Sequence, residues 1–389
     1  MSQTLASCRR ITVFPTYWRQ RTQRFTEQKP TEGTRLKAPT IPICPSHLTY
    51  VDDTTPGFTR RRCGRGFTYF DDAGHKLSDP EQLQRIKSLV IPPNWQRVWI
   101  CSQPDGHLQA TGYDERNRKQ YRYHEEWSKH RQASKFSGLA DFARALPAVR
   151  QRLESDLRRR HWPREKVLAL VVRLLDTYHL RIGNQAYTNS NHTYGATTLR
   201  RKHVQLENGH LALQYRAKSG KYRSIQIADR KLEKLLRAVS ELPGYELFRY
   251  YDRDQKAFRA IDSHDVNQYI QAVSGLPYTA KAFRTWGGTV EAARQFTSAV
   301  KLVREHPQRK FETQLVKLVA AKLGNTITIC REYYIHPTVL CTLVQQHDDD
   351  ALFDRLERAK AAEATGGLDA FENYTLEVLS EPVKPPQAS

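Results

Sequence analysis

The stretch PREKVLALVVRLLDTYHLRIGN, from Pro163 to Asn184, has the closely spaced apolar residues of a buried helix. Pro163 suits a first helical position, and Gly183 suits a helix terminator. Helical spacing begins after Trp127 and returns from Lys231 to about residue 360. A mainly α-helical domain is therefore predicted around this stretch.

Three short strands interrupt the helical pattern in HVQLENGHLALQYRAKSGKYRSIQI. Apolar and polar residues alternate from Val204 to Ile227, as in half-buried strands. Asn208-Gly209 is a type I′ hairpin signal between the first two strands. The second turn holds Lys218, so we expect this lysine at the tip of a hairpin.

The segment from about Leu48 to Trp127 has a different pattern, with short apolar or aromatic runs broken by turn signals. Phe67–Phe70 and Val98–Ser102 read as two of its strands. The predicted fold class is α+β: a strand-rich N-terminal domain, then a mainly α-helical domain with a small three-stranded β-sheet.

We divide the chain into four parts: 1–45, a basic, disordered arm; 46–127, a β-rich domain; 128–365, an α-helical domain; and 366–389, a flexible C-terminal tail. The first part has eight basic and two acidic residues with little periodicity. A transit peptide or a misplaced start codon remains an alternative for it.

The charge of the chain indicates a polyanionic partner. Its 62 Lys and Arg against 41 Asp and Glu give a formal charge of +21 and a pI near 9.8. Residues from 345 onward carry ten acidic and four basic residues, so the preceding part has a net charge of +27. This concentration of charge favours nucleic acid as the partner, and neither a long apolar span nor a basic amphipathic helix indicates a membrane.

Sequence motifs for cofactors are absent. The chain has no H-E-x-x-H, no paired cysteine spacing and no EF-hand loop, so we expect no metal. Gly64-Arg-Gly66 lacks a third glycine, and AKSGK lacks the first glycine of a Walker loop, so we expect no nucleotide cofactor. The six scattered cysteines fit a reduced, cytoplasmic protein.

A second stretch, LGNTITICREYYIHP (Leu323–Pro337), raises the question of chemistry because it holds two adjacent tyrosines. Aromatic residues near a helix end are ordinarily packing, so partners elsewhere must decide. Three cations are candidates: Arg181 after the apolar helix, Lys218 at the hairpin tip and Arg284 in KAFRTW. Each alone is more simply a surface residue of a basic protein.

Together these cations match what phosphoryl transfer to a tyrosine needs. Two guanidinium groups, of Arg181 and Arg284, can hold the non-bridging oxygens of a pentacoordinate phosphate. A mobile lysine, Lys218, can protonate the leaving 5′ oxygen. Because a phenol of pKa about 10 is only about 0.1% ionised at neutral pH, the surrounding cations must favour its deprotonation.

Seven segments of the chain resemble type IB DNA topoisomerases of the bacterial and poxvirus-like branch. They are PGFTRRRCGRGFTYFD, IPPNWQRVWI, TGYDERNRKQYRYH, RIGN, YRAKSGK, KAFRTWGGT and LGNTITICREYYIHP. The resemblance implies the helical catalytic core shared by tyrosine recombinases and these topoisomerases, with the strand-rich and helical domains closing as a clamp around double-stranded DNA, the expected partner. It implies relaxation of supercoils through a 3′-phosphotyrosyl intermediate, strand swivelling and religation, without ATP or metal.

The resemblance also implies roles for individual residues. Arg181 and Arg284 resemble the two phosphate-binding arginines, Lys218 the general acid and Lys281 a second catalytic lysine. The nine-residue step from Asn325 selects Tyr334 rather than Tyr333 as the nucleophile. Asn325 replaces the histidine of the poxvirus enzymes, so an amide supplies a hydrogen bond to phosphate without charge.

Further positions are implied in the strand-rich part. Tyr121, Arg122 and Tyr123 occupy positions where relatives contact DNA, although packing of the two tyrosines in a core is an alternative. We expect a monomer located in the cytoplasm, at the bacterial nucleoid.

Two other functions compete with this interpretation. A tyrosine recombinase shares the Arg, Lys, Arg, Tyr chemistry and the nine-residue step, but typically has His where this chain has Lys281, and its N-terminal domain is usually helical. A non-catalytic DNA-coating protein needs only the basic charge. It gives no reason for the spacing of Asn325 and Tyr334.

Overall fold

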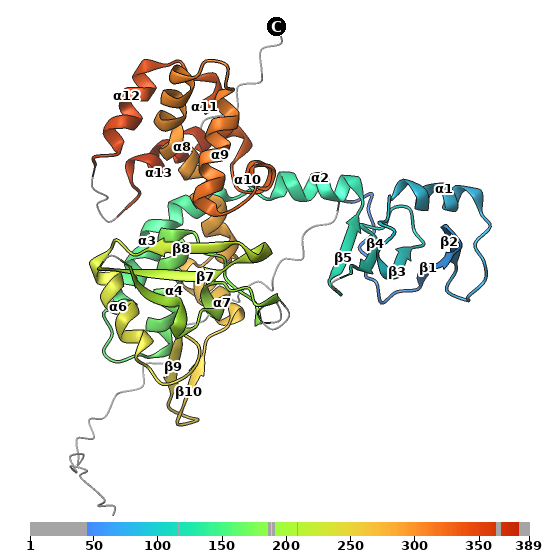
Figure 1. Cartoon of the computed structure of the whole chain (residues 1–389), viewed down its shortest axis with the longest axis horizontal. Coiled ribbons are helices and arrows are strands. Elements are labelled where there is room, and N and C mark those ends of the chain that lie inside the picture. The colour runs from blue at the N-terminus through green and yellow to red at the C-terminus, as the bar shows by residue number, and fades with distance from the viewer. Residues whose placement is uncertain are drawn as a thin grey trace, which may run out of the picture. The chain divides into compact units, whose positions relative to one another are not determined.

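Two separate hydrophobic cores organise the described part of the chain. The computed structural model (Figure 1) describes residues 45–115, 117–185, 188, 191–207, 209–362 and 367–380. The predicted basic arm, 1–45, lies outside the described residues except for its last position. The small core belongs to the N-terminal sheet and the large one to the helices. This confirms the predicted α+β class.

The N-terminal part is an antiparallel five-stranded sheet in the order β2-β1-β3-β4-β5. Its elements are β1 (Gly57–Cys63), β2 (Gly66–Phe70), α1 (Pro80–Ser88), β3 (Gln96–Cys101), β4 (Leu108–Tyr113) and β5 (Lys119–Tyr123). Ile86 of α1 packs on Val98, Ile100 and Ala110 of the sheet. The two strands predicted at 67–70 and 98–102 correspond to β2 and β3.

A run of helices follows, and all of them except the first contribute residues to one large core. They are α2 (Glu125–Ser134), α3 (Leu139–Leu157), α4 (Arg164–Tyr178), α6 (Arg230–Ser240), α7 (Ser263–Ser274), α8 (Ala280–Glu305), α9 (Phe311–Leu323), α10 (Ile327–Tyr333), α11 (Pro337–Gln345), α12 (Asp350–Ala359) and α13 (Ala370–Ser380). A small hairpin, β9 (Arg249–Asp252) and β10 (Ala257–Ala260), accompanies them. Helix α2 crosses the predicted domain boundary at residues 127 and 128, and that boundary stays a prediction.

Helix α4 is the stretch that predicted this domain, and it ends earlier than expected. Nine of its residues are buried, but its last residue is Tyr178, and His179 takes the left-handed cap conformation with φ 52°. The prediction that Gly183 terminates the helix is wrong. The residues between His179 and Gly183 are thereby freed from the helix, and Arg181 is among them.

The three predicted strands form an antiparallel sheet in the order β6-β7-β8. They are β6 (Val204–Glu207), β7 (His210–Arg216) and β8 (Tyr222–Gln226). Glu207 pairs with His210, so the connection is the two-residue turn that Asn208-Gly209 predicts, although Asn208 itself lies outside the described residues. Lys218 lies in the second turn, in the short 3-10 helix Lys218–Gly220, as expected.

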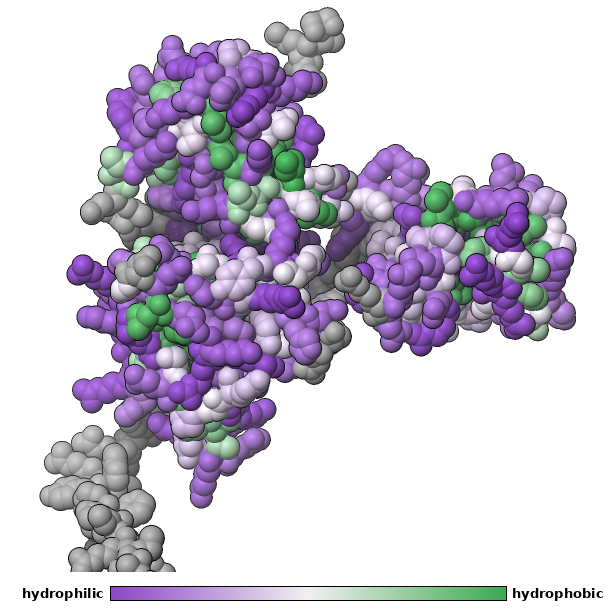
Figure 2. Space-filling view, viewed as in Figure 1, coloured by the Kyte–Doolittle hydropathy of each residue, from purple (hydrophilic) through white to green (hydrophobic). Residues whose placement is uncertain are grey.

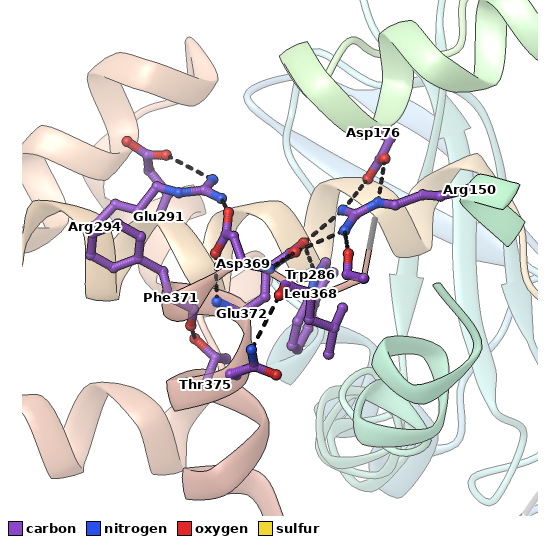
Figure 3. A network of polar contacts seen from close by, with 12 residues as sticks. Arg150, Asp176, Trp286, Glu291, Arg294, Leu368, Asp369, Phe371, Glu372 and Thr375 are labelled. Atoms are coloured by element: carbon purple, nitrogen blue, oxygen red, sulfur yellow. Dashed lines mark hydrogen bonds and ion pairs between the residues drawn. The ribbon is translucent and has the colours of Figure 1, made fainter. Parts of the chain in front are cut away.

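The C-terminal segment differs most from expectation. Residues 366–389 are predicted as a flexible tail, but Ala370–Ser380 is helix α13, with Phe371, Tyr374 and Val378 buried in the large core. Figure 3 shows its polar anchor: Arg150 of α3 binds Glu372 of α13 and Asp176 of α4 through both ends of its guanidinium, at 2.7 to 2.9 Å. The tail prediction is wrong for these residues because their partners are distant in sequence.

The surface is mainly polar on the face drawn in Figure 2, where hydrophilic residues cover most of the area and apolar ones form small patches. None of the described helices combines the length and the apolar composition that crossing a bilayer takes.

Candidate active site

Arg181 lies on a short segment after α4 that backbone contacts hold in place. The amide of Ala196 donates to its carbonyl at 2.7 Å, and the amide of Thr197 donates to that of Ile182 at 2.8 Å. This approach requires glycine at position 195, because a Cβ there would lie 2.6 Å from the Arg181 carbonyl oxygen. The backbone is thus fixed, and the guanidinium projects from it.

Arg284 lies in the first turns of α8 and is 4% exposed. Its guanidinium donates to the carbonyl of His179, the residue that caps α4, and to the carbonyl of Leu323 at 3.1 Å. Burial, and then the charge of Arg181, lower its pKa to about 10. Arg284 is still protonated at neutral pH, and its described contacts include no carboxylate.

Asn325 joins the two arginines. It follows Gly324, which caps α9 in the left-handed conformation, and its Oδ1 accepts hydrogen bonds from Arg181 and, at 3.2 Å, from Arg284. Its Nδ2 is buried without a hydrogen-bond partner among the described residues. Two positive groups therefore converge on one oxygen atom.

The phenol of Tyr334 lies beside this pair of arginines. Arg181 Nη1 is 3.3 Å from Tyr334 Oη, and the Arg284 guanidinium carbon is 5.0 Å from the ring centroid. Burial alone would raise the pKa of this phenol, but the charges of Arg284 and Arg181 outweigh burial and lower its pKa below the ordinary value. The arrangement favours formation of a phenolate.

The backbone of Tyr334 packs directly on α8 at a glycine. A Cβ at Gly288 would lie 2.6 Å from the Tyr334 carbonyl oxygen, so no other residue fits without displacing that backbone. The next residue, Thr289, donates its hydroxyl to the same carbonyl at 3.2 Å and accepts from the amide of His336 at 3.1 Å. Helix α8 thus carries Arg284 and also positions the tyrosine.

Tyr333 has different surroundings. Its side chain is 38% exposed, and Lys135 Nζ lies 3.1 Å from its ring centroid. Both Asn325 and Tyr334 contact Arg181, whereas no described contact joins Tyr333 to either arginine of the site. The two tyrosines therefore differ in their contacts, and the choice of Tyr334 as the nucleophile stays a prediction.

Lys218 is not in contact with this cluster. It is exposed at the hairpin turn, and among the described residues it has no hydrogen-bond or ion-pair partner. The hairpin itself is anchored next to the site, because Arg223 of β8 donates to the carbonyls of Leu323 and Lys322 at 3.2 and 3.1 Å. Lys221 Nζ lies 3.4 Å from the carbonyl of Asn325.

Lys281 lies in the first turn of α8, three residues before Arg284, and is exposed. It lines a cavity together with Lys135 rather than contacting Tyr334 within the described residues. The structure therefore groups Arg181, Arg284, Asn325 and Tyr334, and leaves Lys218 and Lys281 nearby on adjoining elements.

Tyr121, Arg122 and Tyr123 lie on β5, the edge strand of the N-terminal sheet. The two tyrosines are 47% and 45% exposed and stack with ring centroids 6.0 Å apart. Arg122 donates to the carbonyl of Val90 at 3.0 Å. The alternative that these tyrosines fill a core is not supported.

Several residues of the site have no sequence signal that marks them individually. His179 contributes its carbonyl to Arg284, and its ring packs against Gly287. Arg223 and Lys221 dock the hairpin, and Lys135 contacts Tyr333. The sequence signal that is visible here is the pair of glycines after Trp286, because paired glycines inside a helix indicate that another segment packs closely against it.

Within the described ranges, no three His, Cys, Asp or Glu side chains group as a metal site requires.

Comparisons with protein families match most of the chain. A model described as eukaryotic DNA topoisomerase I, catalytic core, matches residues 121–359. A model described as bacterial DNA topoisomerase IB, N-terminal domain, matches residues 66–114. The first match covers every residue grouped around Tyr334, and it ends before α13.

Individual proteins give a consistent result. DNA topoisomerase 1B of Acanthamoeba polyphaga mimivirus is 27% identical over 285 residues, which cover 72% of this chain and 85% of the viral protein. DNA topoisomerase 1 of rabbit fibroma virus (strain Kasza) is 21% identical over 308 residues, which cover 74% of this chain and 92% of the viral protein. Among solved structures, the XerH site-specific recombinase bound to difH aligns with 16% identity and a TM-score of 0.31 over 52% of this chain and 50% of the XerH chain.

Proposed function

Because this chain belongs to the type IB DNA topoisomerases, which bind duplex DNA, we propose that Tyr334 is the nucleophile that cleaves one DNA strand. The contact of Arg181 with both the Tyr334 hydroxyl and the Asn325 amide is the observation that carries the proposal. Since Arg284 shares the same amide oxygen, the two guanidinium groups are already aimed at one point beside the phenol.

In the proposed reaction, Tyr334 Oη loses its proton and forms a bond to the scissile phosphorus as the bond from phosphorus to the 5′ oxygen breaks. Lys218 gives a proton to that oxygen, which leaves as a 5′ hydroxyl. The phosphate stays on the 3′ end as a tyrosyl ester. One phosphodiester has replaced another, so the reverse step reseals the strand without a separate energy source, after the free strand has swivelled and supercoils are lost.

Asn325 marks the position of the phosphate. Its Oδ1 accepts from both arginines, as a non-bridging phosphate oxygen does. We propose that the phosphate displaces this oxygen and that the amide then rotates so that Nδ2, which lacks a partner among the described residues, donates to the phosphate.

Lys218 and Lys281 are proposed to act from the two adjoining elements. Lys218 approaches the 5′ oxygen when DNA fills the site, because Arg223 and Lys221 already hold the turn end of its hairpin next to Asn325. Lys281 lies one helical turn before Arg284 on α8, which directs it toward the same strand.

The role of Lys218 predicts a specific chemical rescue. Lys218→Ala should slow cleavage of an ordinary duplex by about 10²–10⁴-fold, the usual contribution of a general acid. A duplex with sulfur in place of the 5′ bridging oxygen should restore most of the rate, because a thiolate leaves without protonation. Single-turnover cleavage rates measure both. Lys221→Ala, from the same turn, is the matched control and should gain nothing from the sulfur; equal gains for both variants would contradict the assignment.

The β-rich N-terminal domain, residues 46–127, is proposed to contact DNA as a clamp domain, with Tyr121, Arg122 and Tyr123 on the exposed edge strand of its sheet. Stacked, exposed tyrosines beside an arginine can contact sugars and phosphates of a duplex. We further propose that the protein acts as a monomer at the bacterial nucleoid in the cytoplasm.

The experiment that tests the nucleophile is covalent trapping. A duplex with a short segment 3′ of the cleavage site loses that segment after attack, so the protein cannot reseal the strand. Mass spectrometry of the protease-digested adduct should find the DNA on a peptide containing Tyr334, joined to a 3′ phosphate. An adduct on Tyr333, or on a 5′ phosphate, would overturn the proposal.

A further inference from the structure

A cavity of about 320 Å³ lies between the segment after α2 and the start of α8. Its lining includes Arg131, Lys135 and Lys281, together with the polar side chains of Tyr278 and Thr285, and it contains no carboxylate. The positive charges of Lys135 and Lys281 repel each other at this cavity. An anion that entered would relieve that repulsion.

Lys135 is held at the cavity by a cation–π contact. Its ammonium group lies 3.1 Å from the ring centroid of Tyr333, so the side chain is fixed between α10 and the cavity. Burial, and then the charge of Lys281, lower its pKa to about 8, while Glu332 opposes this and Arg131 adds to it. Lys135 is therefore mainly charged at neutral pH, at a cost that a bound anion would offset.

The cavity adjoins the proposed cleavage site on two sides. Lys281 and Arg284 are three residues apart on α8, so they lie on neighbouring positions of one helix face. Tyr333, which Lys135 contacts, directly precedes Tyr334. A DNA strand carries a phosphate about every 3.4 Å of helix axis, so a strand held at Arg284 brings another phosphate near the cavity.

We propose that Lys135, with Lys281 and Arg131, forms a second oxyanion subsite that binds a non-scissile backbone phosphate of the strand being cleaved. This inference depends on the proposed function in one respect, which is that DNA occupies the site formed by Arg181 and Arg284. Its role is to fix the strand in register, with Lys135 as a contact residue that the catalytic step does not require.

The first test measures equilibrium binding of a duplex to the full chain carrying Tyr334→Phe, so that no covalent step contributes. Lys135→Gln should reduce the salt dependence of log K by about 0.9, the value of one phosphate contact, and Lys135→Arg should keep it. Lys234→Gln removes one charge from α6, outside the cavity, and serves as control. An unchanged slope for Lys135→Gln would show that Lys135 only holds Tyr333.

The second test locates the phosphate. Duplexes carry a neutral methylphosphonate at one backbone position at a time, and one non-scissile position should weaken binding about ten-fold, as loss of a hydrogen bond to a charged group does. That effect should vanish with Lys135→Gln. Failure of every position to couple to Lys135 would overturn the subsite, and neither result depends on which tyrosine is the nucleophile.

A small free phosphate is the other anion that fits this cavity. One outcome is that pyrophosphate binds without DNA and loses its affinity with Lys135→Gln while no methylphosphonate position couples to Lys135. In that case the cavity is a site for small phosphates, and its assignment to DNA is wrong. We expect pyrophosphate to compete with duplex only at concentrations at which ionic strength alone weakens binding.

Discussion

Tyr334→Phe should leave supercoiled plasmid unrelaxed at every enzyme concentration, because the substitution removes the one oxygen that can bond to phosphorus. The change deletes a single atom, and the half-buried ring keeps its packing against the core and against Arg284. Duplex affinity should therefore stay close to that of the unmodified chain. Agarose gels of plasmid incubated with EDTA and without nucleotide measure relaxation, and fluorescence anisotropy measures affinity.

Tyr333→Phe is the matched control for this prediction. A phenylalanine ring keeps the cation–π contact with Lys135, and the Tyr333 hydroxyl has no described contact with Arg181 or Arg284. We expect this variant to relax plasmid at nearly the unmodified rate. Relaxation by Tyr334→Phe together with loss of activity in Tyr333→Phe would reverse the assignment of the two tyrosines.

Glu372→Ala should lower the free energy of unfolding by about 3 kcal/mol, because it breaks a buried ion pair on one side only. Burial alone would raise the pKa of Glu372, but its contacts with Arg150 outweigh burial and keep its pKa below the ordinary value. The variant also leaves the indole N–H of Trp286 without the acceptor it now has at 3.1 Å. Asp176 still neutralises Arg150, so we expect the lower end of the range for broken buried pairs.

Urea titration followed by circular dichroism measures this change. Glu377→Ala lies on the same helix and removes an exposed pair with Arg355, so it should change stability by no more than about 0.5 kcal/mol. Equal stability of the two variants would show that the buried ion pair of Glu372 does not anchor α13. Since Trp286 lies two residues after Arg284 on α8, relaxation by Glu372→Ala should weaken at temperatures where the chain still folds.

The elements that sequence predicted well are those with local signals. Asn208-Gly209 predicted a hairpin, and the alternation around it predicted three strands, as observed. The nine-residue step between Asn325 and Tyr334 spans the short helix α10, so both side chains reach Arg181. These features depend on residues close to one another in the chain.

The features that sequence did not predict depend on distant partners. Helix α13 carries apolar residues at positions 371, 374 and 378, which fit one helix face, but its anchor Arg150 is more than two hundred residues away, and the flanking Gly and Pro residues suggested an end to structure. The position of Lys135 on Tyr333, and of Arg223 at the end of α9, likewise follow only from the packed fold.

The hydrogen bonds from Arg181 and Arg284 to the Asn325 amide have a consequence for the protein when no DNA is bound. A sulfate ion or a single nucleotide that enters must displace the Asn325 oxygen with its own charge alone. A duplex is also attracted by contacts along its whole bound length. Because both arginines already bind an internal oxygen when DNA is absent, we expect the proposed cleavage site to bind small anions weakly and a long polyanion well.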